Sequence, residues 1–175
     1  MKHIKLIIIP IMALIIGITI SCERDDICPE STPTTPRLIV DLYDKDDQEN
    51  QKNAFGLLVV GVGNEQVLPG YVVVTADDLI LPLKTDASPT QYRLILNAEF
   101  DNDGNLTGGN EDIITINYVP EEVYVSRACG YKTIFKSVEL IVEPDSDNWL
   151  TLTPTNLTNN EPVENENETH FNIFH

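Results

Sequence analysis

Hydrophobic and polar residues alternate along much of this chain, and alternation with a period of two is typical of β-strands. The longest alternating segment is QYRLILNAEF at 91–100. One set of its residues is expected on a single face of a sheet: Tyr92, Leu94, Leu96, Ala98 and Phe100. A Gly- and Asn-rich turn follows at 101–111, and DIITINYV at 112–119 alternates again. The two alternating segments and their turn predict a long β-hairpin.

Three further segments predict strands with different surroundings. RLIVDLY at 37–43 alternates and is expected to bury one face. AFGLLVVGVG at 54–63 is continuously apolar, which favours a central strand that is covered on both faces. DLILPL at 78–83 contains Pro82, and a proline confines its strand to the edge of a sheet. The chain therefore supplies candidates for both central and edge strands.

The second half of the chain contains a break in the alternation. In YKTIFKSVELIVE at 131–143, the apolar residues before and after Lys136 and Ser137 have opposite parities. A β-bulge at these two residues would shift the phase of the strand in this way. NWLTL at 148–152 predicts a further short strand, and HFNIFH at 170–175 predicts a final one.

These signals together predict an all-β protein, an immunoglobulin-like antiparallel β-sandwich of about seven to nine strands. The expected sandwich is a single domain at 37–175, with a long polar loop near 154–168. A chain of this length fits one domain.

The first 21 residues have the pattern of an export signal. Lys2 and Lys5 accompany an almost purely apolar run at 6–18, and the small residue Ser21 precedes Cys22. The apolar run is shorter than the ~20 residues that a membrane span needs. We therefore expect a cleaved signal peptide at 1–21, and the alternative is an uncleaved N-terminal anchor.

The junction at Cys22 resembles a bacterial lipobox, in which a cysteine after a small residue is lipidated and becomes the first residue of the mature protein. Thr19 departs from this pattern, because a Leu is usual at that place. The resemblance implies a lipidated Cys22, a tether at 22–36, and attachment to the outer membrane, at the cell surface or on the periplasmic face. Each buried CH₂ contributes about 0.8 kcal/mol, so several acyl chains hold a soluble domain on a membrane.

The chain is strongly acidic, which excludes some classes of partner. It contains 11 basic and 28 acidic residues, with a formal net charge of −17. Cleavage before Cys22 would remove two lysines and leave 154 residues with a net charge of −19. Nucleic acids and anionic headgroups bind positive charge, so neither is an expected ligand of this surface. The ERDD cluster at 23–26 has two interpretations, a sorting signal for the outer face of the outer membrane and a solvated tether.

Cys28 and Cys129 form an even pair once Cys22 is assigned to the lipid. Outside the cytoplasm such a pair can form a disulfide, which would close a loop of about 100 residues and contribute up to ~4.7 kcal/mol. The alternative is a nucleophilic Cys129, but a thiolate needs a base, and no histidine lies nearby in the sequence. Two cysteines without histidines also make a poor zinc site.

Four short motifs run through the chain: CERDDIC at 22–28, TTPRL at 34–38, LPL at 81–83 and SRACGY at 126–131. They are similar to motifs of a family of uncharacterised flavobacterial (Bacteroidetes-type) lipoproteins of unknown function. The resemblance covers most of the mature chain and supports a pairing of Cys28 with Cys129. It implies no catalytic residue, because that family has no assigned activity.

One turn has a partial calcium-loop pattern. Its candidate ligands are Asp101, Asp103, Asn105 and Asp112. Calcium takes about six to eight oxygens, and an EF-hand loop places Gly sixth and Glu twelfth. Here Leu106 and Asp112 occupy those two places. An ordinary Asx and Gly hairpin turn explains the same residues. We therefore expect no cofactor, and Ca²⁺ is the alternative.

The sequence contains little enzyme machinery. After the leader the histidines are His170 and His175, and there is no G-x-S-x-G or H-E-x-x-H motif. Trp149, Tyr43 and Tyr71 could form an aromatic platform for a carbohydrate, although a lone Trp in a sandwich is more often in the core. The sequence therefore predicts a non-enzymatic, membrane-anchored envelope protein with a structural, adhesion or accessory-binding role. Its partners would be the membrane and an envelope protein or a glycan, and the alternative is a surface module that binds a glycan or Ca²⁺.

Overall fold

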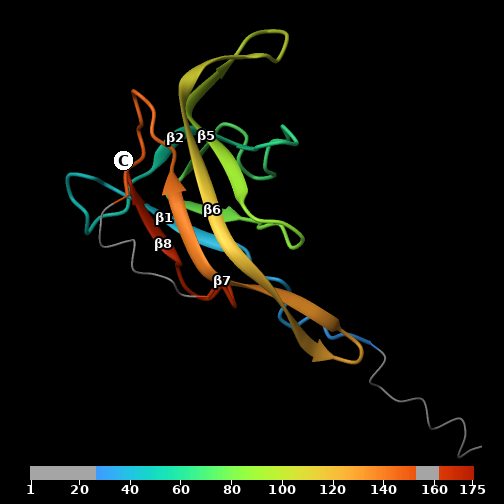
Figure 1. The fold of residues 1–175 in the computed structure, drawn as a ribbon. Helices are drawn as coiled ribbons and strands as arrows, with labels where there is room; N and C mark the ends of the chain where they lie inside the picture. The colour runs from blue at the N-terminus through green and yellow to red at the C-terminus, as the bar shows by residue number, and fades with distance from the viewer. Residues whose placement is uncertain (1–26, 153–161) are drawn as a thin grey trace, which may run out of the picture. The chain divides into compact units, whose positions relative to one another are not determined.

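Two β-sheets form the regular structure of the described residues. The computed structural model describes residues 27–152 and 162–175. The smaller sheet has the strand order β4-β1-β8. Its strands are β1 (Leu38–Tyr43), β4 (Asp78–Leu81) and β8 (Phe171–Phe174). β1 pairs antiparallel with β4 and parallel with β8, so the last strand lies beside the first (Figure 1).

The larger sheet has the strand order β3-β2-β5-β6-β7. Its strands are β2 (Ala54–Gly61), β3 (Val74–Ala76), β5 (Thr90–Phe100), β6 (Leu106–Ser126) and β7 (Gly130–Val142). β2 pairs antiparallel with β3 and with β5, and β5 pairs antiparallel with β6. The pairing of β5 with β6 confirms the predicted long hairpin. In the smaller sheet, β4 ends directly before Pro82 and is an edge strand, as predicted.

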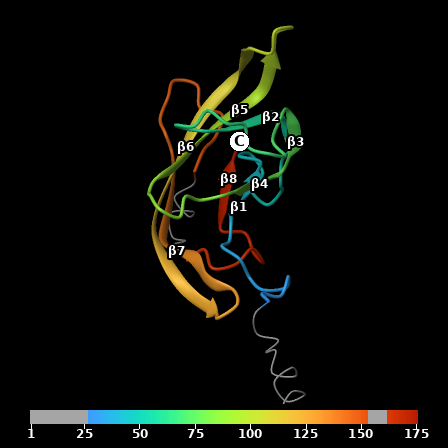
Figure 2. The same cartoon turned by 90° about the vertical axis from the view of Figure 1, so that its right-hand side faces the viewer.

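One apolar cluster joins the two sheets and determines how they pack. Leu38, Val40 and Leu42 of β1 are fully buried in it, because alternate residues of a strand point to the same face. Four strands of the larger sheet contribute to the cluster, among them the residues Leu57, Val59, Leu94, Ile114, Ile116, Phe135 and Leu140. The described residues therefore form an all-β sandwich, as predicted (Figure 2). The immunoglobulin-like topology stays a prediction.

A second, smaller cluster lies on the other face of β2 and β5. Its members are Leu58, Val60, Ile95 and Ala98. β2 is therefore buried on both faces, as its continuous apolar run predicts. The prediction that Ala98 shares a face with Leu94 is wrong, because Ala98 packs with Ile95 instead. The φ angle of Asn97 is +53°, and the pairing register of β5 shifts around this residue. This bulge reverses the phase of the strand.

The bulge predicted in β7 is confirmed. Lys136 and Ser137 are consecutive exposed residues between the buried residues Phe135 and Val138. The φ angle of Ser137 is +52°, in the left-handed region. Because the bulge takes up two outward positions in succession, Phe135 and Val138 both point into the core.

The segment predicted as a strand at 148–152 does not join a sheet along its length. Thr151 alone forms an isolated bridge, with Phe174 of β8. The backbone N–H groups of Trp149 and Leu150 instead donate to a side-chain carboxylate, that of Asp112. The final strand predicted from HFNIFH is confirmed as β8.

The described residues fall into two compact units. The smaller unit includes 27–32 and 124–131, and the larger includes 33–123 and 132–175. The predicted leader at 1–21, Cys22 and the start of the tether lie outside the described residues, as does the segment 153–161 of the predicted polar loop. In the described part of the chain, no helix is long and apolar enough to cross a membrane.

Polar contacts fasten the segment before β8 to β1. Nε and Nη2 of Arg37 donate to the carboxylate of Glu166 at 2.8 and 2.5 Å. His170 is 8% exposed, and its Nδ1 accepts a hydrogen bond from the backbone N–H of Ile39 at 2.9 Å. The backbone N–H of His170 donates to the carbonyl of Ile39, also at 2.9 Å. Burial lowers the pKa of His170, and the neutral ring is the form that can accept at Nδ1.

We expect the fold to lose stability as the pH falls from about 7.5 to about 5.5, partly through His170. The pKa of His170 is lower in the folded chain than in the unfolded one, so the unfolded chain binds the proton first. His170→Gln keeps an acceptor for the Ile39 N–H but cannot be protonated, so this variant should lose less stability over the same range. Urea unfolding at several pH values measures both proteins. An equal pH dependence of the two would contradict this role of His170.

Candidate functional site

A pocket of about 330 Å³ is the candidate binding site of the larger unit. Its lining combines the loop between β1 and β2, the start of β2, the bulge of β5, the segment at 148–152 and the residue after β8. The lining includes Lys45, Lys52, Phe55, Asn97, Trp149 and His175. Ligand pockets in proteins have volumes of about 300–1,000 Å³, so this one has room for a single small, ring-shaped group.

Two irregular backbone positions shape one wall of the pocket. Gly56 has a φ angle of +59°, and a Cβ atom at this residue would lie 3.0 Å from the Cα of Asn97. Asn97 itself has a φ angle of +53°. The register of β2 with β3 and that of β5 with β6 both shift in this region. Bulges of this kind redirect side chains, and here Phe55 is left 61% exposed beside the pocket.

A buried carboxylate positions a second aromatic residue of the lining, Trp149. Oδ2 of Asp112 accepts a hydrogen bond from the backbone N–H of Leu150 at 2.8 Å, and Oδ1 lies 3.3 Å from that of Trp149. Nε1 of Trp149 donates to the carbonyl of Leu94 at 3.3 Å. Burial raises the pKa of Asp112, while hydrogen bonds from Leu150, Asn148 and Trp149 act in the opposite direction. Hydrogen bonds from its backbone N–H and from its indole Nε1 thus hold Trp149 in place.

Two lysines line this pocket although the whole chain has a net charge of −17. Nζ of Lys52 donates to the carbonyl of His175 at 2.9 Å and lies 3.5 Å from the carboxylate of Asp44. Lys45 takes part in none of the ion pairs among the described residues, so its charge can face a ligand.

The third titratable group of the pocket is the His175 ring. Burial lowers the pKa of His175, and the charges of Lys52 and Lys45 act in the same direction, against the hydrogen bond with the Lys52 carbonyl and the charge of Asp44. The His175 ring meets the Trp149 ring at a centroid distance of 5.4 Å and an interplanar angle of 86°. Aromatic faces, a side-chain amide and a cation are together suited to a polar ring that carries an acidic group.

Three of the four predicted calcium ligands lie in one turn, and Asp112 lies apart from them. The carboxylate of Asp101 accepts hydrogen bonds from the backbone N–H groups of Asp103 and Asn105 at 2.9 and 2.8 Å, as in an Asx turn. Asp112 is instead fully buried against Leu150. Among the residues that the structure describes, no three His, Cys, Asp or Glu side chains form a group that could hold a metal ion.

The three aromatic residues considered for a carbohydrate platform lie in different surroundings. Trp149 lines the pocket. Tyr43 packs on Phe174 at a centroid distance of 5.9 Å, and the hydroxyl of Tyr71 accepts a hydrogen bond from the backbone N–H of Ile80 at 2.8 Å. Of the three, Trp149 alone belongs to the lining, and Phe55, which sequence reasoning missed, is its aromatic neighbour there. Phe55 lies within an apolar run, so no local pattern sets it apart.

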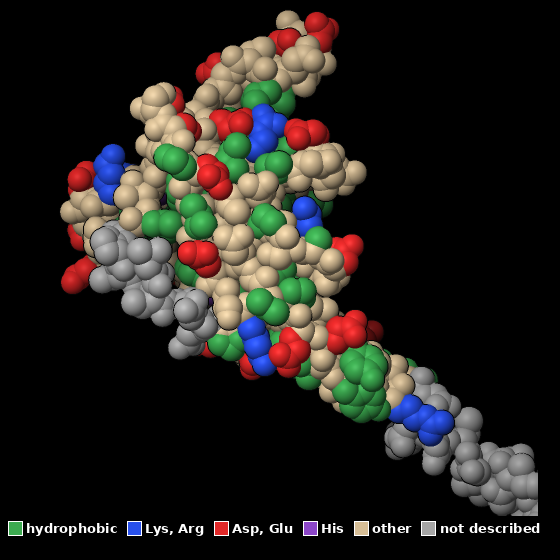
Figure 3. Space-filling model, in the orientation of Figure 1, with side chains coloured by type: hydrophobic (Ala, Val, Ile, Leu, Met, Phe, Trp, Pro, Cys, Tyr) green, Lys and Arg blue, Asp and Glu red, His purple; other side chains and the backbone are tan. Residues whose placement is uncertain are grey.

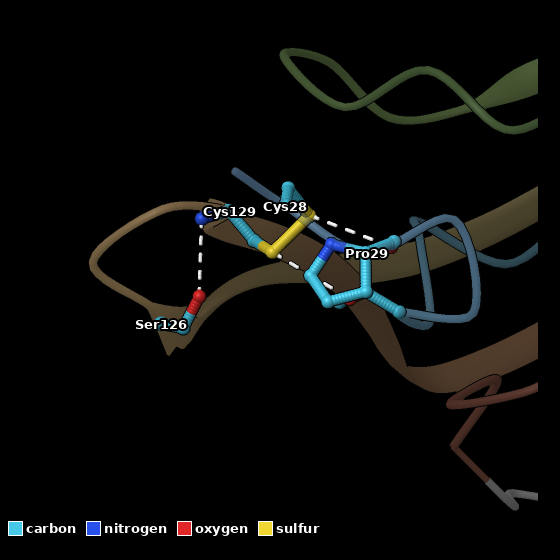
Figure 4. The surroundings of a disulfide bond; sticks show 5 residues. Cys28, Pro29, Ser126 and Cys129 are labelled. Atoms are coloured by element: carbon cyan, nitrogen blue, oxygen red, sulfur yellow. Dashed lines mark hydrogen bonds between the residues drawn. A yellow bond between two sulfur atoms is a disulfide. The ribbon is translucent and has the colours of Figure 1, made fainter. Parts of the chain in front are cut away.

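The predicted disulfide between Cys28 and Cys129 is present in the smaller unit. It joins residues 101 positions apart, with a Cα–Cα distance of 4.8 Å. The backbone N–H of Cys129 donates to Oγ of Ser126 at 3.0 Å (Figure 4). The Cys129 sulfur lies 3.6 Å from the hydroxyl of Thr32. The alternative of a nucleophilic Cys129 is wrong for this oxidised form, because its sulfur is not a thiol.

A comparison with protein families assigns the chain to one of them. The model of a family described as "Family of unknown function (DUF6452)" matches residues 56–175. The chain belongs to this family. The matched part of this DUF6452 member includes Cys129 and Trp149, whereas Cys28, Lys45 and Phe55 precede it. Comparisons with curated proteins and with solved structures find no match.

We expect Asp112→Asn to lower the free energy of unfolding by about 1–3 kcal/mol, because an amide cannot accept at both of its polar atoms and leaves a buried backbone N–H without a partner. The matched control is Asp103→Asn in the exposed turn, which should change stability by less than about 0.5 kcal/mol. Chemical denaturation at neutral pH measures both. Equal effects of the two substitutions would show that Asp112 does not hold the 148–150 segment.

Proposed function

We propose that the chain is an exported lipoprotein of the cell envelope, with acyl chains on Cys22 and a β-sandwich that acts as a non-enzymatic adhesion or accessory-binding module. The observation that carries this proposal is the disulfide between Cys28 and Cys129. Disulfides persist in oxidising compartments and are rare in the cytoplasm. The bond begins six residues after the cysteine that the lipobox resemblance implies to be lipidated.

The acidic surface supports an anchor made of lipid. A net charge of −17 gives the chain no electrostatic attraction to anionic headgroups, so stable membrane attachment requires a hydrophobic contribution. Two or more acyl chains supply it. The resemblance to flavobacterial lipoproteins supports the outer membrane as the place of attachment, with the sandwich at the cell surface or on the periplasmic face.

The surroundings of the pocket's titratable groups support a binding role over an enzymatic one. General acid–base catalysis needs a group that can exchange a proton with a substrate. His175 uses Nε2 in a contact of 3.2 Å with the carbonyl of Lys52. Lys52 in turn donates to His175 and lies close to Asp44. Lys45 is then suited to ion pairing with a ligand.

We expect Cys22→Ala to abolish acylation and to move the protein out of the outer-membrane fraction, because no other cysteine precedes the folded part in a lipobox-like context. The chain is expressed in a diderm bacterium with an alkyne-labelled fatty acid, and intact mass and gradient fractionation are the readouts. The matched control, Cys28→Ser with Cys129→Ser, should keep the label. An unprocessed leader in the wild type, or label retained by Cys22→Ala, would refute the anchor.

A second candidate function is glycan binding at the Trp149 pocket, and it is compatible with the first. The observation that favours it is a pocket lined by the exposed Phe55 ring, by Trp149 and by Lys45, which takes part in no ion pair among the described residues. Aromatic faces stack on sugar rings, and a lysine can pair with a sugar carboxylate.

We expect a panel of neutral and uronic-acid-containing oligosaccharides to contain a ligand, and Phe55→Ala to weaken its binding about two- to tenfold, since an aromatic contact contributes ~0.5–1.5 kcal/mol. Phe100→Ala is the matched control, because it removes another exposed ring that does not line the pocket. Isothermal titration calorimetry gives both affinities. If no saccharide in the panel bound, or if both substitutions weakened binding equally, the pocket would not be a glycan site.

A further inference from the structure

The end of the β6–β7 hairpin presents two aromatic rings to solvent. Tyr124 and Tyr131 are 58% and 66% exposed, and their ring centroids are 5.4 Å apart at an interplanar angle of 69°. Hydrophobic side chains gather at this end of the hairpin (Figure 3). Single exposed apolar residues are common on protein surfaces and need no explanation. Two exposed aromatic rings in contact form a larger apolar patch, and such patches mark interaction sites.

A covalent restraint limits how far this end can move from residue 22. The disulfide joins Cys129, in the turn between β6 and β7, to Cys28. Cys22 and Cys28 are six residues apart in the sequence. A fully extended chain spans at most about 3.3–3.6 Å per residue, so Cys28 stays within about 22 Å of residue 22. The Cα atoms of Cys28 and Cys129 are 4.8 Å apart, which keeps Cys129 in the turn within about 26 Å of residue 22. Without the disulfide, the tether side and this hairpin would still be joined at Thr35, whose hydroxyl accepts a hydrogen bond from the backbone N–H of Thr133 at 3.0 Å. The path from residue 22 to that contact is 13 residues long, about twice the path to Cys28.

The charge of the smaller unit differs from that of the rest of the chain. Its described residues contain one acidic and one basic side chain, Glu30 and Arg127, whereas the whole chain has a net charge of −17. This unit therefore carries little of the charge that would repel an anionic surface. Residues 23–26 of the tether are Glu23, Arg24, Asp25 and Asp26, with a net charge of −2, which favours zwitterionic over anionic headgroups.

From the exposed rings, the short tether and the low charge, we infer that the hairpin end, residues 124–131 with Cys28, contacts the headgroup region of the membrane that carries the anchor. Tyrosine suits this region, because its ring is apolar and its hydroxyl reaches water and headgroups. The inference rests on the proposed acylation of Cys22. It adds a second membrane contact, which would restrict the orientation of the smaller unit on the bilayer.

The test places a fluorophore at the hairpin end of the full-length acylated protein. Tyr131→Trp is reconstituted in phosphatidylcholine vesicles, with or without bromine in the acyl chains as a quencher. Phe55→Trp is the matched control, because Phe55 is also an exposed aromatic residue but belongs to the larger unit. Trp149, the single native tryptophan, contributes the same background to both variants.

We expect bromine to reduce the emission of the Tyr131→Trp residue about twofold more than that of the control residue. Adding Cys28→Ser and Cys129→Ser to the Tyr131→Trp variant should reduce the excess quenching, because the covalent restraint is then lost and the tether side is joined to β7 by the hydrogen bond of Thr35 with Thr133. Equal quenching of Tyr131→Trp and Phe55→Trp, in protein whose acylation mass spectrometry has verified, would overturn the inference and leave the lipid anchor intact. If the hairpin end instead contacted a second copy of the chain, the two variants would again be quenched equally. That outcome would be recognised by an oligomer of the acylated protein in detergent, and it would also overturn the inference. Protein without acyl chains would instead refute the proposed function.

Discussion

The burial of β1 between its two neighbours and the larger sheet is the interaction on which the rest of the structure depends. Leu38, Val40 and Leu42 are fully buried, and β1 pairs on one side with β4 and on the other with β8. Because β8 lies parallel to β1, the residue after β8 reaches the loop that follows β1. The carbonyl of His175 accepts from Nζ of Lys52, and the pocket forms where these segments meet.

The pocket combines a regular scaffold with irregular backbone. Paired strands hydrogen-bond each other's backbone groups. A bulge interrupts this pairing locally and changes the direction in which nearby side chains point. Gly56 and Asn97 occupy such places on neighbouring strands, with left-handed φ angles. On the other side, the Asp112 carboxylate replaces the missing sheet partner of Leu150. The two devices hold Phe55 and Trp149 at the pocket without extending either sheet.

The disulfide connects the fold to the proposed place of the protein in the cell. It closes a loop of about 100 residues, for which chain entropy predicts a contribution of up to ~4.7 kcal/mol. It also holds the turn between β6 and β7 near the start of the described chain. The same bond therefore cross-links the smaller unit and limits the distance between that unit and Cys22, and the proposed compartment outside the cytoplasm is one in which disulfides persist. A lipid anchor and a contact through Tyr124 and Tyr131 would both use this restraint.

The sequence by itself determined the features that depend on local pattern. Period-two alternation placed most strands, the phase slip located the bulge at Ser137, and cysteine count indicated the disulfide. The tertiary structure alone decided the pocket, the end of the β5 alternation at Asn97 and the role of Asp112. The physical reason is that strand propensity acts between near neighbours, whereas a partner for a buried carboxylate or for Trp149 comes from segments far apart in the chain.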